Sequence, residues 1–181
     1  MNLPNKLTTV RMILTPFILM SIYFEGFRIY ALVLFAVAVI TDYFDGWFAV
    51  HKNMKSRFGN FLDPVTDKIL ILSCFILLSF LEILPLWFVL IILGREFTMN
   101  GLRSALSNEK TIIGANIGGK IKFSFQSLLI FLSIIYLIFS NNSKLLFLLY
   151  ILTLIVLLIS LWGLFNFIFK NKKIIKALIK A

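Results

Sequence analysis

The sequence has few of the residues that most often carry the chemistry of soluble enzymes. It contains one cysteine and one histidine, and only 14% of its residues are charged. Cys74 has no second cysteine to pair with, which excludes a disulfide within the chain, and its apolar neighbours predict a packed residue instead of a reactive thiol. His51 lies among basic residues beside an apolar run, where a solvated imidazole is expected more than a catalytic one.

What the chain has in excess is apolar residues. They make up 60% of its 181 positions, and the mean hydropathy is +0.98, whereas an ordinary soluble domain is about half apolar and about one quarter charged. The net charge of +10 could suit nucleic acid, but the basic residues flank apolar runs instead of forming a stripe between aromatics. The composition therefore predicts a membrane protein whose basic residues meet anionic lipid headgroups.

Six apolar runs account for most of the chain, and a helix needs about 20 such residues to cross a bilayer. They cover residues 7–24, 29–49, 61–80, 84–106, 117–140 and 145–169. Because the runs are continuous and do not alternate with polar residues, they predict helices and not the strands of a membrane barrel. We predict an all-α polytopic membrane protein with six transmembrane helices, organised as a six-helix domain over 1–169 and a basic cytoplasmic tail over 170–181.

The distribution of lysine and arginine predicts the orientation. Fourteen lie at the N-terminus, around residues 52–57, between residues 103 and 122, and in the tail from residue 170. The opposite loops hold two, Arg28 and Lys144. Because cytoplasmic loops carry the excess of basic residues, both termini are expected on the cytoplasmic side of a cell (inner) membrane.

Polar residues of the first five runs fall in the halves expected to face the cytoplasm. They are Asn5, Thr8, Arg11, Asp42, Asp45, Asp63, Asp67, Arg95, Arg103, Lys120 and Lys122. Ionisable groups at membrane depth are costly unless they face one another or water, so the pattern predicts a polar cavity open to the cytoplasm. The fourth run is strongly apolar only over 83–93, so its polar half needs shelter from protein. The uncharged sixth run is expected to be scaffold.

Four of the eight acidic residues lie close together in the sequence, between positions 42 and 67. Asp42 and Asp45 are three apart and Asp63 and Asp67 four apart, so each pair shares one helix face, with axial offsets of about 4.5 Å and about 6 Å. The two helices are consecutive and antiparallel, so both pairs can meet across one gap. Pro64 is expected in the opening turn of its helix, where amide hydrogens lack partners anyway.

Converging carboxylates repel one another unless they are protonated or bind metal. Their hard oxygen atoms suit Mg²⁺ or Mn²⁺, and four are enough for two ions about 3.5–4 Å apart, as in metal-dependent phosphoryl chemistry. The competing interpretation is four solvated aspartates at helix ends, which is disfavoured because acidic residues in membrane helices are rare without a function. Gly46 and Gly59 flank the connecting loop, where close approach of a ligand and ordinary helix capping both remain open.

The pattern Asp42-x-x-Asp45-Gly46-x-x-Ala49, followed by Gly59-x-x-x-Asp63-x-x-x-Asp67, resembles the signature of the CDP-alcohol phosphotransferases. The opening NLPNKLTTVRMIL and the blocks GREFTMNGLR and GGKIK are similar to the phosphatidylglycerophosphate synthases of that family. The resemblance covers about residues 2–165. It implies a six-helix fold with a cytoplasmic cavity, and transfer of a phosphatidyl group from CDP-diacylglycerol to glycerol 3-phosphate with release of CMP.

The resemblance also implies roles for single residues. The divalent metals would be held by Asp42, Asp45, Asp63 and Asp67. The CDP-lipid would be bound by Asn5, Thr8, Gly46, Ser56 and Gly59. Asp67 would in addition be the catalytic general base. The chain departs from the family at Val50, where arginine is usual, so a cationic contact to the diphosphate is missing or comes from Lys52 or Arg57.

A phosphorylated acceptor needs cations away from the metals, and four residues of the fourth and fifth runs are placed to bind its phosphate: Arg95, Arg103, Lys120 and Lys122. The competing interpretation is that they only set the topology, which accounts for Lys110 but less well for Arg95, deep in its helix. Glu96 and Arg103 are seven apart on one helix face, which suggests a shared polar network.

Several alternatives remain open at the level of sequence. A cation transporter would also place carboxylates in membrane helices, but it predicts polar residues continuing to the outer side, where this chain has almost none. An intramembrane prenyltransferase would need two well-separated aspartate clusters and a longer chain. Within the family, serine, inositol phosphate or a phosphatidyl lipid could replace glycerol 3-phosphate. A homodimer is also left open, and the basic tail suits either an anionic membrane surface or a frayed helix end.

Overall fold

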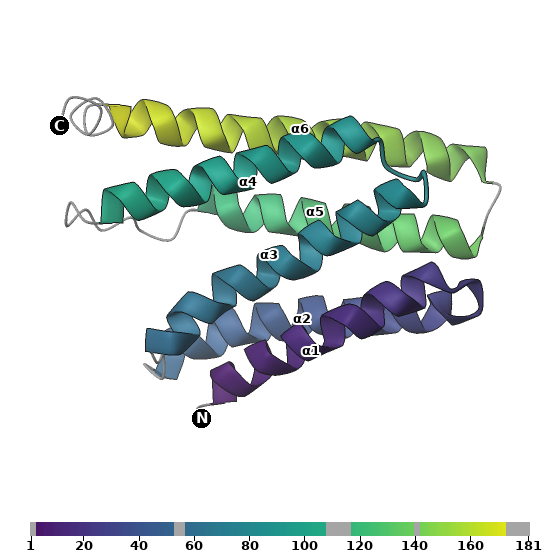
Figure 1. The fold of residues 1–181 in the computed structure, drawn as a ribbon, viewed down its shortest axis with the longest axis horizontal. Coiled ribbons are helices and arrows are strands. Elements are labelled where there is room, and N and C mark those ends of the chain that lie inside the picture. The colour runs from purple at the N-terminus through teal and green to yellow at the C-terminus, as the bar shows by residue number, and fades with distance from the viewer. Residues whose placement is uncertain (1–2, 53–56, 108–116, 140–141, 173–181) are drawn as a thin grey trace.

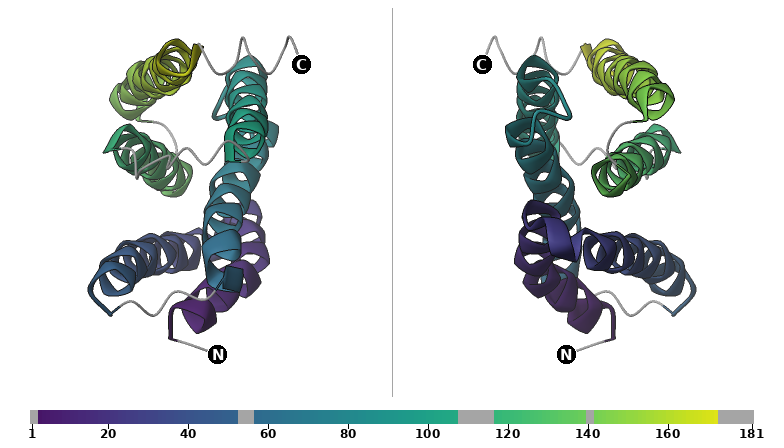
Figure 2. Two further views of the ribbon diagram at one scale, coloured as in Figure 1. Left: turned by 90° about the vertical axis from the view of Figure 1, so that its left-hand side faces the viewer. Right: turned by 90° about the vertical axis from the view of Figure 1, so that its right-hand side faces the viewer.

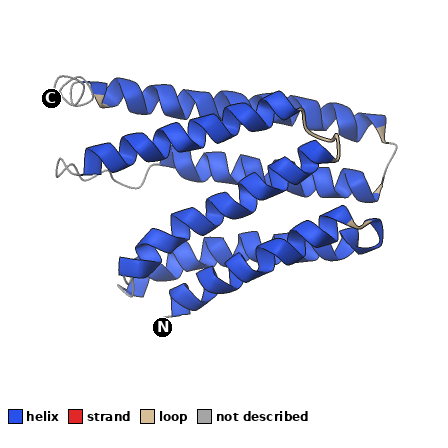
Figure 3. Ribbon diagram, in the orientation of Figure 1, coloured by secondary structure: helices blue, strands red, loops and turns tan. Residues whose placement is uncertain are grey.

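The computed structural model describes residues 3–52, 57–107, 117–139 and 142–172, without the side chains of 3–8, 42–52, 57–64, 67, 107 and 117. The helices are α1 (Leu3–Tyr23), η1 (Glu25–Phe27), α2 (Arg28–Lys52), α3 (Arg57–Phe80), α4 (Leu86–Ser107), α5 (Ile117–Ile138) and α6 (Ser143–Lys170). Throughout these described ranges every regular element is helical (Figures 1 and 3). The prediction of an all-α protein with six helices is confirmed.

Most helix ends lie within a few residues of the predicted spans. The start of α3 is the difference that changes the place of a predicted residue, Pro64. It begins at Arg57, so Pro64 lies inside the helix and the prediction that placed it in the opening turn was wrong. The apolar run marks only the part of a helix that suits hydrocarbon, whereas α3 continues through the polar residues before it. Because proline has no N–H, it gives no intrahelical hydrogen bond to the carbonyl of Asn60.

The helices form two layers of three. Figure 2 shows α1, α3 and α4 stacked in one layer and α2, α5 and α6 in the other. Helix packing follows this arrangement, with α1 against α2 and α3, α5 against α2, α3 and α6, and α4 against α3 and α6. α3 crosses obliquely and joins the lower helices of Figure 1 to the upper ones.

Short connections with defined polar contacts join the helices at the right-hand end of Figure 1. Arg28 at the start of α2 pairs with Glu25 at 3.2 Å, and its NH1 donates to the carbonyl of Leu137 at 2.9 Å. This ties α2 to the last turn of α5. The Asn142 side chain accepts hydrogen bonds from the amides of Lys144 and Leu145 and so caps α6.

The core between the layers is made of aliphatic and aromatic side chains. Phe35, Phe75 and Phe88 are fully buried or nearly so, and the rings of Phe75 and Phe88 meet edge to face with centroids 5.4 Å apart. Large apolar side chains also cover the exterior, including Phe80 and Phe147, which are 72% and 68% exposed. A soluble protein rarely exposes such contiguous apolar surface, whereas lipid solvates it.

Among the described residues, two helical segments are long and apolar enough to cross a membrane by themselves, Gly118–Ile138 and Ser143–Lys170. Within the part of α1 and α3 whose side chains are described, the apolar stretches are Thr9–Tyr23 and Lys68–Phe80. Crossing by all six helices stays a prediction.

Candidate functional site

The aspartates lie in two consecutive helices, whose connected ends lie at the same end of the molecule. Asp42 and Asp45 belong to the second half of α2, and Asp63 and Asp67 to the first half of α3. Figure 1 places the end of α2 and the start of α3 at the left-hand side of the molecule, where α4 and α6 also end, and Figure 2 shows these two ends in different layers. The backbone therefore places both aspartate pairs toward the same end of the fold, and their meeting across one gap stays a prediction.

The side chains of these four aspartates are outside the description, and so are those of the residues predicted to bind the CDP-lipid. Asn5, Thr8, Gly46 and Gly59 lie in helices, at positions where only the backbone is described. Ser56 lies outside the described residues. Among the described side chains there is no group of three potential metal ligands. The aspartate site is thus defined here by helix position and donor type alone.

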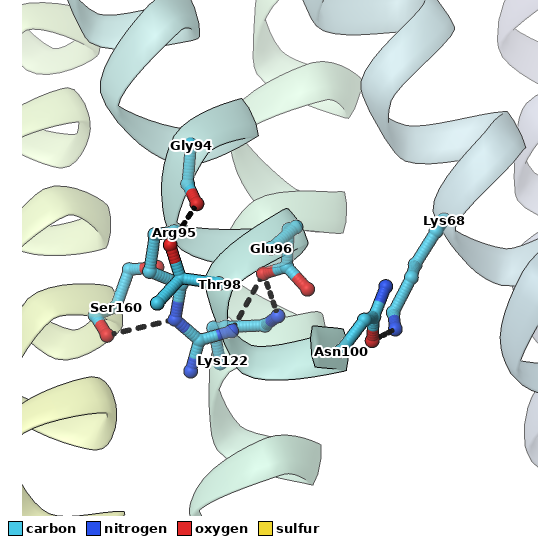
Figure 4. A network of polar contacts seen from close by, with 8 residues as sticks. All are labelled: Lys68, Gly94, Arg95, Glu96, Thr98, Asn100, Lys122 and Ser160. Carbon is cyan, nitrogen blue, oxygen red and sulfur yellow. Dashed lines mark hydrogen bonds and ion pairs between the residues drawn. The ribbon is translucent and has the colours of Figure 1, made fainter. Parts of the chain in front are cut away.

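A buried network of charged residues lies at the middle of α4 (Figure 4). The Oε1 atom of Glu96 accepts a hydrogen bond from Arg95 NH1 at 2.6 Å and another from Lys122 Nζ of α5. The side chains of Arg95, Glu96 and Lys122 are 8%, 6% and 13% exposed. The bundle therefore shelters Arg95 and Glu96, but Asn100 and Arg103 further along α4 are exposed, so the predicted shelter of its polar half is only partial. One carboxylate joins two of the four cations assigned to the acceptor phosphate.

α6 contributes to this network, so its assignment as scaffold was incomplete. The Nε atom of Arg95 donates to the carbonyl oxygen of Ser160 at 3.1 Å (Figure 4). A Cβ atom at Gly163, nearly one turn further along α6, would stand 3.2 Å from Arg95 NH2. The sequence could not reveal this because the acceptor is a backbone carbonyl and the other contribution is a missing side chain.

A second polar contact lies on the side of α4 that faces α3. Lys68, the residue after Asp67, donates through Nζ to Oδ1 of Asn100 (Figure 4). Asn100 and Glu96 are four apart, so they share one face of α4. Sequence reasoning did not single out Lys68 or Asn100. The available signal was the position of a lysine directly beside the second aspartate pair, at the start of an apolar stretch.

The other two predicted acceptor ligands lie apart from the contacts of Glu96. Arg103 is exposed, and its guanidinium stands over the Phe167 ring of α6 at 6.0 Å from the centroid. Lys120 is exposed at the start of α5. In the described contacts Glu96 pairs with Arg95 and Lys122, and the suggested network of Glu96 with Arg103 does not form.

A sequence model of the family described as CDP-alcohol phosphatidyltransferase matches residues 1–162, which include both aspartate pairs and the Glu96 network. The chain belongs to this family. Membership makes it a membrane-associated transferase of phospholipid biosynthesis and sets aside the transporter and prenyltransferase alternatives.

Curated relatives within the family share about a third or more of the aligned residues. The Bacillus subtilis CDP-diacylglycerol–glycerol-3-phosphate 3-phosphatidyltransferase is 37% identical over 135 residues, 67% of this chain and 70% of the relative. A Mycobacterium tuberculosis protein named probable phosphatidylglycerophosphate synthase is 40% identical over 134 residues, 71% of this chain but 64% of the relative. The Rickettsia bellii 3-phosphatidyltransferase is 37% identical over 130 residues, 69% of this chain and 70% of the relative.

Proposed function

We propose that this CDP-alcohol phosphatidyltransferase transfers the phosphatidyl group of CDP-diacylglycerol to glycerol 3-phosphate and releases CMP. The printed names of the bacterial relatives support the substrates. The observation that carries the acceptor assignment is the convergence of Arg95 and Lys122, from two helices, on one buried carboxylate. Two cations against one anion leave a net charge of +1, which suits a phosphorylated acceptor better than a neutral alcohol.

We assign two divalent metal ions, either Mg²⁺ or Mn²⁺, to the aspartates of α2 and α3. The donor set fits, because four carboxylates are carried to the same end of the fold and hard oxygen ligands suit these ions. The residues that would hold the metal are Asp42, Asp45, Asp63 and Asp67. Bound there, divalent ions would supply positive charge to the diphosphate and to the charge that develops on the departing CMP.

In the proposed reaction Asp67 takes the proton of the acceptor hydroxyl. The hydroxyl oxygen then forms a bond to the phosphorus on the lipid side of the diphosphate, and the bond from that phosphorus to the CMP oxygen breaks. The cytidine diphosphate would be held at the start of α1 by Asn5 and Thr8, with Gly46, Ser56 and Gly59 at the α2–α3 end. Val50 adds no charge there, so we assign the missing cationic contact to Lys52 or Arg57.

Arg95 and Lys122 are the proposed ligands of the acceptor's phosphate. Lys122 has further N–H donors beyond the one given to Glu96, and the planar guanidinium of Arg95 suits phosphate oxygens. Arg103 and Lys120 are proposed at the exposed rim of the same site, where they would attract the anion more than hold it. Lys68, beside Asp67 and held by Asn100, lies between this pair and the aspartates in the proposed arrangement.

Purified protein with CDP-diacylglycerol, Mg²⁺ and radiolabelled candidate acceptors tests the proposed function directly. Glycerol 3-phosphate is expected to give labelled phosphatidylglycerophosphate and an equal amount of CMP. Serine, inositol phosphate and free glycerol are expected to give little product, because none combines the phosphate and the glycerol hydroxyl that the site is proposed to bind. Faster turnover with one of them would replace glycerol 3-phosphate as the acceptor.

We further propose that the aspartate end of the bundle faces the cytoplasm, where the substrates would be supplied. In a Cys74→Ser background, a cysteine introduced by Lys55→Cys should resist an impermeant maleimide in intact cells and react in inverted vesicles. A cysteine introduced by Asn141→Cys should behave in the opposite way. The physical reason is the excess of Lys and Arg at the aspartate end. Labelling of the Lys55 position from outside intact cells would contradict this orientation.

A further inference from the structure

Glu96 differs from the other acidic side chains that the structure describes. Glu25 and Glu82 are exposed at the opposite end of the bundle, whereas Glu96 is buried and lies at the junction of α4, α5 and α6. A carboxylate is rarely buried in a membrane protein unless it is paired and serves a function. None of the assigned metal, nucleotide or acceptor contacts uses it, so its role needs a separate account.

The contacts of Glu96 fix two cations in one place. Its Oε1 atom accepts from Arg95 NH1 at 2.6 Å and from Lys122 Nζ, and both bonds are visible in Figure 4. Without the carboxylate, a guanidinium and an ammonium would be buried side by side, and like charges in such a setting repel strongly. Glu96 therefore permits the two groups to stay close, and its shape sets their separation.

The remaining contacts show which donors are used and in which direction. Arg95 donates from Nε to the Ser160 carbonyl of α6 and from NH1 to Glu96. These two hydrogen bonds fix the orientation of its planar guanidinium. Lys122 has a flexible stem, and its described hydrogen bond is the one to Glu96. A single anchor thus decides where the ammonium of α5 stands relative to the guanidinium of α4.

We propose that Glu96 is a positioning residue for the acceptor's phosphate, holding Arg95 and Lys122 at the separation that lets both donate to one phosphate group. Glu96 itself makes no contact with the substrate in this arrangement. The inference rests on the proposed function, because it assumes that this pair binds the phosphate of glycerol 3-phosphate. It predicts that loss of the Glu96 charge lowers the affinity for the acceptor, because Arg95 and Lys122 then change position.

The test compares Glu96→Gln with wild type in detergent-purified enzyme. Glutamine keeps the size and one acceptor oxygen but removes the charge that holds the cations together. The KM for glycerol 3-phosphate is expected to rise about tenfold or more, the scale of one charge-assisted hydrogen bond, while the KM for CDP-diacylglycerol stays within about twofold. Glu82→Gln, on the exposed α3–α4 connection, is the matched control and should leave both constants unchanged.

A second comparison separates positioning from a general structural role. Added to Lys122→Ala, the Glu96→Gln change is expected to raise the acceptor KM much less than it does in wild type, because its effect passes through Lys122. Equal increases in both backgrounds, or a parallel rise in the KM of both substrates, would overturn the positioning role. If Glu96→Gln does not accumulate in the membrane, Glu96→Asp is measured instead. It keeps the charge but shortens the anchor, and an unchanged acceptor KM would overturn the proposal.

The same measurements distinguish this inference from the proposed function. If Arg95→Ala and Lys122→Ala leave the acceptor KM unchanged, the phosphate site itself is wrong and the role of Glu96 falls with it. If both raise that KM and Glu96→Gln does not, the phosphate site stands and the positioning role alone is refuted.

Discussion

Replacing Asp63 or Asp67 by asparagine is expected to lower turnover by roughly a hundredfold or more, the largest effect of any single change proposed here. Asparagine keeps the shape and one oxygen of each side chain but removes the negative charge that would hold a divalent ion. Asp67→Asn also removes the proposed proton acceptor. The measurement is CMP release from CDP-diacylglycerol and glycerol 3-phosphate at saturating Mg²⁺.

Three controls make this result specific to metal. Glu82→Gln removes an acidic charge from the opposite end of the bundle and should leave CMP release unchanged, and the aspartate variants should reach the membrane in normal amounts. EDTA should abolish wild-type activity, and added Mg²⁺ or Mn²⁺ should restore it. Near-normal CMP release by either aspartate variant in the presence of EDTA would end the dimetal proposal.

The sequence predicted the helical fold well because each helix is signalled locally, by the apolar residues of the helix itself. A continuous apolar run is a strong local signal, and six of them gave six helices with similar bounds. The pattern was less informative where a helix continues through polar residues. α3 begins at Arg57 before its apolar part, which is why the position of Pro64 within the helix was misplaced.

The charged site was only half predictable for a different reason. Residue type and depth indicated that Arg95 and Lys122 had a function, and the structure does bring them together. Which cations share a partner depends on the packing of α4 against α5 and α6, and no local pattern contains that information. Arg103, on the same helix as Arg95, instead stands over Phe167. The hydrogen bond to the Ser160 carbonyl could not be predicted either, because every residue has a backbone carbonyl and the sequence does not mark the one that is used.

The packing of α3 against α4 supports the proposal that the aspartates and the two buried cations belong to one site. Lys68 follows Asp67 directly in α3 and is held by Asn100 of α4, one turn from Glu96. The polar contact between α3 and α4 thus links the helix that carries two aspartates to the helix that carries Arg95 and Glu96. A phosphate donor at the aspartates and a phosphate-bearing acceptor at Arg95 and Lys122 would then approach each other across the face of α4 that carries Glu96 and Asn100.

This arrangement predicts the second large effect, a loss of affinity for the acceptor when either cation is removed. Arg95→Ala and Lys122→Ala should each raise the KM for glycerol 3-phosphate by about 10- to 100-fold, because each removes a charge-assisted hydrogen bond of about 1.5–3 kcal/mol. The KM for CDP-diacylglycerol should change little, since the nucleotide and diphosphate are assigned to α1, α2 and the start of α3. Initial rates with each substrate varied in turn measure both constants.

A variant that leaves both cations in place tests the same site without deleting a charge. Gly163→Leu adds a side chain where a Cβ would already stand 3.2 Å from Arg95 NH2, so it should displace the guanidinium and raise the acceptor KM. Gly101→Leu is the matched control, because a Cβ at Gly101 of α4 meets no atom within 4 Å. Gly101→Leu should therefore leave the acceptor KM near its wild-type value. An acceptor KM that is unchanged in Arg95→Ala, Lys122→Ala and Gly163→Leu alike would place the phosphate of glycerol 3-phosphate elsewhere in the bundle.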